Sequence, residues 1–187
     1  MVRLLTEHVE QLLADLDTAA RTDRLTGLGN RRALEEDFRR EAARAERTGE
    51  PIALVLIDLN RFKDINDLYG HAAGDRALVG VAERMRLVLR ASDVAARIGG
   101  DEFLLLLPNA DVASATAIAL RLTTAAASRE DGATPVGLSF GVAACEDGVE
   151  SLDDLMRRAD QALYEKKRAR YGGAASSTPL SAPMARR

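Results

Sequence analysis

The chain has 187 residues, which is enough for one domain with a short extension and too few for two full domains. Hydrophobic residues make up 47% of it, so a packed core is expected and a wholly disordered chain is excluded. The 26 Lys and Arg against 29 Asp and Glu argue against a general nucleic-acid binder. With one cysteine, Cys145, and no apolar run near the ~18 residues of a membrane span, we expect a soluble cytoplasmic protein, or the soluble part of a larger one, without a membrane segment.

The first 22 residues are predicted to form a coiled-coil helix. Apolar residues recur there at alternating intervals of three and four, as at the a and d positions of a heptad repeat: Val2, Leu5, Val9, Leu12, Leu16 and Ala19. We interpret residues 1–22 as the stalk of a parallel dimer; the alternative is an amphipathic helix packed on its own domain. Because roughly three heptads are short for independent stability, the repeat is expected to continue in an upstream sensor region that this chain lacks.

From residue 23 onward, predicted helices and strands alternate along the chain. Helices are expected over residues 30–48, 76–89, 111–127 and 151–170, and strands over residues 52–57, 94–98, 103–107 and 136–144. The polar segment 59–75 is predicted to be a loop, and the Gly-, Ala-, Ser- and Pro-rich segment 172–187 a disordered tail. The order predicts one α/β (α+β) domain over residues 23–171, with a mixed sheet in which a hairpin lies beside the first strand.

Three acidic residues stand at the ends of these predicted strands. Asp58 follows the first strand, and Asp101 and Glu102 occupy the hairpin turn after Gly99 and Gly100. If hairpin and strand are neighbours, the three carboxylates converge, and Mg²⁺ favours one or two carboxylates plus substrate phosphates. The alternative is that Asp58 caps a loop while the other two are solvated turn residues. The glycines favour the phosphate site, because they let the backbone approach a phosphate closely.

The segment after Asp58 holds a second group of polar side chains. Lys63 is a point cation suited to a polyphosphate. Asn66 offers both donors and an acceptor and Asp75 offers acceptors only, so the two facing one pocket would read the edge of a guanine base. On its own, His71 is interpreted as a turn-capping or core histidine rather than a catalytic base.

Together these motifs resemble the GGDEF family of diguanylate cyclases. The resemblance extends over about residues 23–167 and rests on DRLTGLGNRR (23–32), DLNRFKDINDLYGHAAGD (58–75) and RIGGDEF (97–103), in the family's order. It implies a fold like that of nucleotidyl cyclase and polymerase palm domains, with a central mixed antiparallel sheet flanked by helices. It also implies condensation of two GTP into cyclic di-GMP with release of two pyrophosphates, by a homodimer that uses Mg²⁺, with Mn²⁺ as the alternative ion.

The resemblance further implies roles for individual residues. The metal ligands would be Asp58, the carbonyl of Leu59, Asp101 and Glu102, where Glu102 either shares the metal or activates the attacking hydroxyl. The phosphate contacts would be Lys63, Gly99, Gly100, Lys167 and Arg170, and the nucleotide pocket would contain Phe62, Asn66, His71 and Asp75. Arg90 and Asp93 match the RxxD site at which the product, cyclic di-GMP, inhibits the family's enzymes.

One segment departs from the family pattern. After the last lysine motif the family usually reads Gly-Arg-Asn, whereas this chain has Arg170-Tyr171-Gly172. Either Arg170 reaches the phosphates from a shifted helix end, or the site has one cation fewer and a lower activity. The alternative function is therefore a weak or inactive GGDEF domain that binds GTP or cyclic di-GMP as a sensor or effector. A purely structural dimerisation module would leave the acidic hairpin unexplained.

Overall fold

The computed structural model describes residues 20–128, 135–145, 148 and 150–171, apart from the side chains of the last two. The predicted tail and residues 1–19 of the predicted stalk lie outside this part. The elements are α2 (Arg31–Thr48), β1 (Ile52–Leu59), α3 (Phe62–Tyr69), α4 (His71–Val88), β2 (Val94–Arg97), β3 (Glu102–Pro108), α5 (Val112–Ala127), β4 (Leu138–Cys145) and α6 (Leu152–Tyr171). No helix in the described ranges combines the length and apolarity needed to cross a membrane.

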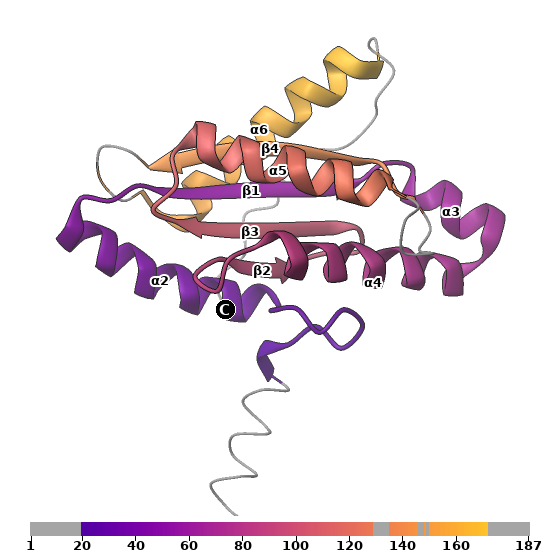
Figure 1. Ribbon diagram of the computed structural model, residues 1–187, viewed down its shortest axis with the longest axis horizontal. Helices are drawn as coiled ribbons and strands as arrows, with labels where there is room; N and C mark the ends of the chain where they lie inside the picture. Colours follow the sequence, from indigo (N-terminus) through magenta and orange to yellow (C-terminus); the bar gives the residue numbers. More distant parts are fainter. Residues whose placement is uncertain (1–19, 129–134, 146–147, 149, 172–187) are drawn as a thin grey trace, which may run out of the picture.

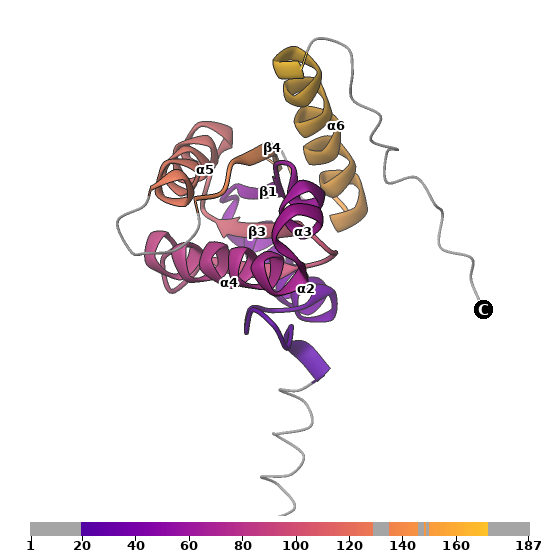
Figure 2. The ribbon, with the colours of Figure 1, turned by 90° about the vertical axis from the view of Figure 1, so that its right-hand side faces the viewer.

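The four strands form one sheet in the order β2-β3-β1-β4. Every pair of neighbouring strands in it is antiparallel, so the sheet is not mixed as the element order had suggested. Helices α4 and α5 cover one face and α2 and α6 cover the other, as Figures 1 and 2 show from two directions. This arrangement confirms the predicted α+β architecture with a central antiparallel sheet flanked by helices.

Strand β1 is buried on both faces because helices cover both sides of the sheet. Val55 and Ile57 pack in the cluster on the side of α4 and α5. Leu54 and Leu56 pack in the cluster on the side of α2 and α6. Alternate residues of a strand point to opposite faces, so a strand with two covered faces needs an unbroken apolar run. The run over residues 52–57 is the sequence signature of this central position.

The predicted loop over residues 59–75 is wrong, since most of it is helical. It contains α3 and the first turns of α4, separated by Gly70 at φ 80° and ψ 160°. Phe62 and Ile65 of α3 are partly buried against the core cluster. Their spacing of three places them on one face of the helix, while Leu68 and Tyr69 at its end are exposed. Four of its eight residues are apolar, but two helical turns are too short a window to establish a helical period, so the polar and charged residues between them favoured a loop.

Helix α6 packs so closely on β4 that the strand position facing it, Gly141, has no room for a side chain. A Cβ atom on Gly141 would lie 1.9 Å from the carbonyl oxygen of Ala159 and 2.4 Å from the amide nitrogen of Leu163. Both residues belong to the buried face of α6. The glycine therefore sets the depth at which α6 rests on the sheet, and with it the position of the side chains further along this helix.

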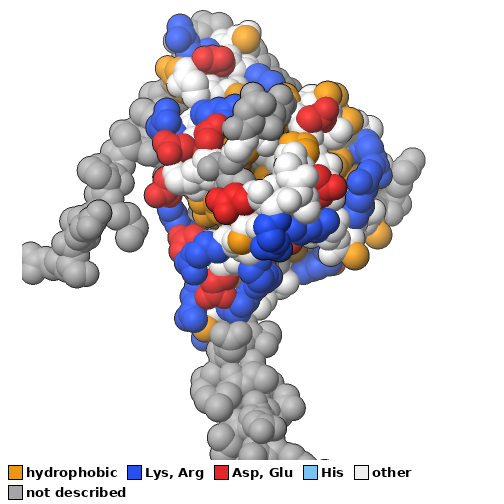
Figure 3. Space-filling view, turned by 90° about the vertical axis from the view of Figure 1, so that its left-hand side faces the viewer, with side chains coloured by type: hydrophobic (Ala, Val, Ile, Leu, Met, Phe, Trp, Pro, Cys, Tyr) orange, Lys and Arg blue, Asp and Glu red, His pale blue; other side chains and the backbone are white. Residues whose placement is uncertain are grey.

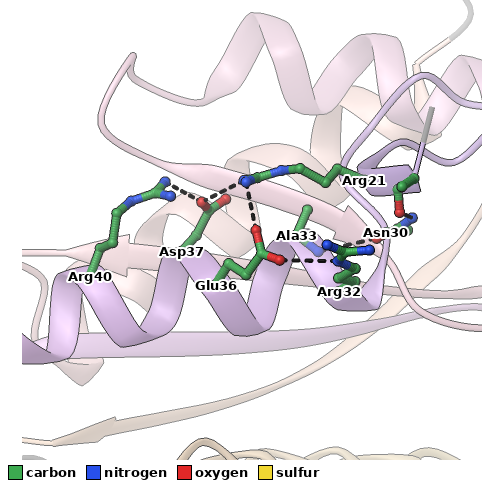
Figure 4. A network of polar contacts seen from close by, with 8 residues as sticks. Arg21, Asn30, Arg32, Ala33, Glu36, Asp37 and Arg40 are labelled. Carbon is green, nitrogen blue, oxygen red and sulfur yellow. Dashed lines mark hydrogen bonds and ion pairs between the residues drawn. The ribbon is translucent and has the colours of Figure 1, made fainter. Parts of the chain in front are cut away.

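The chain before α2 is attached to that helix by charged and polar contacts (Figure 4). Arg21 donates to Glu36 at 2.6 Å and to Asp37 at 3.3 Å. The side chain of Asn30 caps α2 by accepting from the backbone of Ala33, and it donates to the carbonyl of Ala20 at 2.8 Å. The helical residues Ala20 and Arg21 are thereby held in a defined position on the domain.

The surface on the side of the domain shown in Figure 3 carries charges of both signs. Lys and Arg side chains are interspersed there with Asp and Glu. This distribution agrees with the nearly balanced composition and differs from the single basic face of many nucleic-acid-binding domains.

The close packing at Gly141 predicts the effect of a substitution. Gly141→Ala should lower the free energy of unfolding by about 1–3 kcal/mol or more, because its Cβ collides with backbone atoms of α6 that cannot rotate away. Urea denaturation measures the change. The matched control is Gly100→Ala, whose Cβ would meet no atom within 4 Å. Equal stability of the two variants would contradict this account of how α6 is placed.

Candidate active site

The register between β1 and β3 brings the acidic residues predicted for the site together. Asp58 is the pairing partner of Glu102, and the backbone N–H of Leu59 donates to the carbonyl of Asp101 at 3.2 Å. Paired residues of antiparallel strands project to the same face of a sheet. Asp58 and Glu102 alternate with residues of the α4 and α5 side, so both belong to the face covered by α2 and α6.

A lysine from α6 reaches this cluster from above the sheet. Lys167 Nζ lies 2.7 Å from Asp58 Oδ1, and the two side chains are only 18% and 17% exposed. Asp160 lies seven residues before Lys167, which places both on one side of α6. Lys167, expected at the phosphates, is thus in contact with one of the expected metal ligands.

The environment of the hairpin acids disfavours their charged forms. Burial raises the pKa of Asp101, and the negative charge of Asp58 raises it further. Burial likewise raises the pKa of Glu102, with smaller contributions from the charges of Asp58, Asp101 and Asp160, while Lys167 acts in the opposite direction. Because these carboxylates are buried and close to one another, binding of a cation beside them is favourable.

A magnesium ion fits this donor set. Within the described ranges, no three His, Cys, Asp or Glu side chains form a ready cluster around a single point. An ion here would therefore bind one or two carboxylates and complete its shell with backbone oxygen, water or phosphate. Mg²⁺ typically has this mixed coordination, and it prefers hard oxygen ligands.

The glycine turn before these acids is held by an arginine to which the sequence assigned no role. Arg97 donates from Nη2 to the carbonyl of Gly100 at 2.8 Å and from Nη1 to Asp23 at 3.3 Å. Burial alone would raise the pKa of Asp23, but hydrogen bonds from Thr26 and the charge of Arg97 outweigh it and lower that pKa. The segment before α2 therefore supports the turn. Asp23 and Arg97 both lie in the quoted family motifs, and this position was the sequence feature that could have indicated their role.

The predicted nucleotide pocket residues occupy α3 and the start of α4. These helices lie at the end of the sheet where β1 ends and β3 begins (Figure 1). Asn66 is packed against Gly74, where a Cβ atom would be only 2.1 Å from Asn66 Oδ1 and 3.1 Å from the ring of Phe62. Gly74 lies in the quoted motif 58–75, and the structure adds its close contact with Asn66. Lys63, His71 and Asp75 are exposed on the same pair of helices.

Ser139 and Asn60 lie beside Asp58, and of the two only Asn60 belongs to the quoted sequence motifs. Ser139 of β4 is the second pairing partner of Asp58 and donates to Asn60 Oδ1 at 2.6 Å. Asn60 Nδ2 is buried and has no hydrogen-bond partner within the described residues. Ser139 lies far from the acidic motifs in the sequence, so only the strand register reveals that it is adjacent.

The predicted product site lies just beyond the end of α4. Helix α4 ends at Val88, so Arg90 and Asp93 lie in the turn that follows it. Asp93 Oδ2 accepts from the backbone N–H of Arg90 at 2.9 Å, which closes the turn. The turn borders a pocket of about 450 Å³ that Gly27 and Arg86 also line.

The side chain of Arg170, which is predicted to contact the phosphates, lies outside the described part of the structure. Its backbone belongs to α6, which continues to Tyr171. The departure from the family pattern at Arg170-Tyr171-Gly172 thus begins inside a helix.

Comparison with known proteins relates the chain to one family. The family profile described as "Diguanylate cyclase, GGDEF domain" matches residues 20–172. Diguanylate cyclase DgcP of Pseudomonas aeruginosa is 41% identical over 161 residues, which are 84% of this chain and 24% of that protein. The probable diguanylate cyclase DgcE of Escherichia coli is 41% identical over 166 residues, 87% of this chain and 15% of that protein. The chain thus spans about a quarter or less of these two relatives.

A solved structure agrees in fold over most of the chain. It contains the coiled coil and GGDEF domain of DgcB from Caulobacter crescentus in complex with c-di-GMP. The two structures superpose with a TM-score of 0.81 at 30% sequence identity, and the match covers 90% of this chain and 91% of that chain.

The raised pKa of Glu102 predicts a pH-dependent gain in stability on removing its charge. A carboxyl whose folded-state pKa is raised contributes stability that is present below its ordinary pKa of 4.5 and is lost as the pH rises through the folded-state pKa. Glu102→Gln should therefore raise the Tm of the metal-free protein at about pH 8 and leave it nearly unchanged at about pH 4. Thermal denaturation in EDTA measures this, with the exposed Glu83→Gln as control. Parallel pH profiles for wild type and Glu102→Gln would contradict it.

Proposed function

This chain belongs to the GGDEF family of diguanylate cyclases, and we propose that it condenses two GTP into cyclic di-GMP with release of two pyrophosphates. The observation that carries the proposal is the pairing of Asp58 with Glu102 next to Asp101, with Lys167 in contact with Asp58. Such a cluster joins the hard oxygen ligands of a metal to a cation for phosphates. The GTP requirement, together with the single buried cysteine, favours the cytoplasm as the place of reaction.

The carboxylates would hold the metal and the attacking group. Asp58, Asp101 and the carbonyl of Leu59 would hold Mg²⁺ or Mn²⁺, and Glu102 would share the ion or accept the proton of the 3′-hydroxyl. When bound, the ion neutralises charge on the phosphates of GTP. Loss of that proton lets the 3′-oxygen bond to the α-phosphorus of the other GTP, and the bond to the β-phosphate oxygen breaks. The raised pKa of Glu102 suits a general base.

The remaining site residues would bind the nucleotide. Lys63 and Lys167 would neutralise the leaving pyrophosphate, and the backbone of Gly99 and Gly100 would pass close to the phosphates. The base would lie against the α3 and α4 group: Phe62, Asn66, His71 and Asp75. Asp75 accepts hydrogen bonds only, which matches the N1–H and N2–H₂ donors of guanine.

Two domains are needed for the proposed reaction. One domain binds one GTP, so the attacking 3′-hydroxyl comes from a second GTP held by a facing copy. A two-fold axis between the copies would let one set of residues form both bonds. The predicted stalk over residues 1–22 would hold the pair together, and an upstream sensor region would act through it.

The second candidate function is a GTP- or cyclic di-GMP-binding sensor without turnover. The departure at Arg170-Tyr171-Gly172 favours it, since one expected cation is displaced in the sequence. The presence of Asp58, Asp101 and Glu102 favours the enzyme. Incubation with GTP and Mg²⁺ separates the two, because only the enzyme releases cyclic di-GMP and pyrophosphate.

Removing either metal carboxylate should abolish synthesis. Asp58→Ala and Asp101→Ala each delete a charged ligand, and neither side chain belongs to the apolar core, so the variants should still fold. Chromatography of cyclic di-GMP after incubation with GTP and Mg²⁺ measures the loss, and circular dichroism checks the fold. Asp153→Ala, an exposed carboxylate in the first turn of α6, is the control. More than roughly a tenth of wild-type turnover in Asp58→Ala would contradict the assignment.

Arg90 and Asp93 are proposed to bind the product and limit its accumulation. No ion pair joins the two side chains in the described part of the molecule, and the Asp93 carboxylate is turned to the backbone of Arg90. The exposed guanidinium is thus available for the phosphate or guanine of cyclic di-GMP. The turn and its pocket follow the C-terminal end of α4, whereas the predicted nucleotide residues lie on α3 and at the start of α4. Bound product would therefore hold two domains apart without occupying the GTP site.

Arg90→Ala should therefore raise the cyclic di-GMP concentration at which synthesis stalls. Progress curves with added cyclic di-GMP measure this, and Arg121→Ala, an exposed arginine on α5, is the control. Equal noncompetitive inhibition of wild type and Arg90→Ala would mean that the turn has only a structural role.

A further inference from the structure

The contact between Lys167 and Asp58 has a consequence for how a metal ion enters the site. We infer that Lys167 competes with the divalent ion for Asp58, so that the lysine neutralises this ligand until ion and nucleotide are both present. The inference rests on the proposed function for the assignment of Asp58 to the metal and of Lys167 to the phosphates. It adds that the same lysine has two alternative partners.

The geometry makes the two cations compete for one carboxylate. Lys167 Nζ is 2.7 Å from Asp58 Oδ1, at a position where both side chains are more than four-fifths buried. An ion bound to the same oxygen would displace the ammonium directly. An ion bound to the other oxygen would lie only a few ångströms from it, where repulsion between a dication and an ammonium is weakly screened.

The charge distribution explains why a cation is held there at all. The negative charges of Asp58, Asp101 and Asp160 act on Glu102, and that of Asp58 acts on Asp101. Lys167 is the cation that directly contacts this cluster within the described residues. It approaches from α6, whose depth Gly141 sets, so its position is built into the packing of the domain.

A nucleotide would resolve the competition. Its phosphates give Lys167 an anionic partner a short distance from Asp58, and the ion then takes the carboxylate that the lysine leaves. Binding of ion and nucleotide would therefore be coupled, and such coupling acts equally in both directions. The ion alone should bind weakly, and removal of the lysine should relieve that weakness.

The test measures Mn²⁺ binding without any nucleotide. Electron paramagnetic resonance of free Mn²⁺ gives the dissociation constant for wild type and for Lys167→Met. The variant should bind Mn²⁺ more tightly by roughly three- to tenfold, since a competing charge in direct contact with the ligand is gone. The matched control is Lys166→Met, which removes one charge from the adjacent position of α6. Lys166 Nζ lies 3.9 Å from the centroid of the Phe140 ring, and this control should bind Mn²⁺ as wild type does.

Two further variants keep the test decisive. Lys167→Arg retains the cation and should bind Mn²⁺ about as weakly as wild type, and Lys167→Gln replaces the Met variant if circular dichroism shows that variant to be unfolded. Unchanged or weaker binding in the neutral variants overturns the inference. So does an equal gain in Lys166→Met, which would indicate net charge alone, or a lack of Mn²⁺ binding by every protein.

The same measurement separates this inference from the proposed function. Tighter Mn²⁺ binding in Lys167→Met, with no cyclic di-GMP made by wild type, would leave the competition standing and refute the cyclase. Synthesis of cyclic di-GMP by wild type, with the same Mn²⁺ affinity in wild type and Lys167→Met, would support the cyclase and refute the competition.

Discussion

The antiparallel register between β1 and β3 is the constraint from which the site follows. It sets Asp58 opposite Glu102 and joins Leu59 to Asp101 through the backbone. A shift of one residue would turn every side chain of β1 to the other face and direct Asp58 into the cluster under α4 and α5. The apolar residues on both faces of β1 prevent that shift, because both sides of the strand are covered. The core thus positions the charged residues.

A second constraint acts on the opposite side of the carboxylates. Gly141 lets α6 rest directly on β4, and this depth allows Lys167 to reach Asp58. A third comes from the segment before α2, where Asp23 orients Arg97 and Arg97 holds the glycine turn. The candidate site is therefore held from three separate parts of the chain. A change far from the carboxylates can still move them.

Stability and the proposed function oppose each other at this edge of the sheet. The pKa values of Asp101 and Glu102 are raised because burial and neighbouring negative charge disfavour their ionised forms. The apolar core supplies the stability that tolerates this crowding. The same crowded negative charges attract cations, and a metal-dependent phosphoryl transfer requires bound cations. Lys167 neutralises part of this negative charge through its ion pair with Asp58.

The sequence alone determined the central strand, the acidic hairpin and the family, because these depend on local patterns: an apolar run, a glycine turn and motifs of fixed spacing. It did not reveal α3, because eight residues are too few to show a helical period, and the packing of Phe62 and Ile65 on the core appears only in the structure. Nor did it show that Arg90 and Asp93 form a turn, since that depends on where α4 ends. Ser139 beside Asp58, Gly74 against Asn66 and Lys167 on Asp58 were decided by tertiary structure only. These contacts join side chains across packed elements, and their geometry is set by strand register and helix depth, which no local spacing encodes.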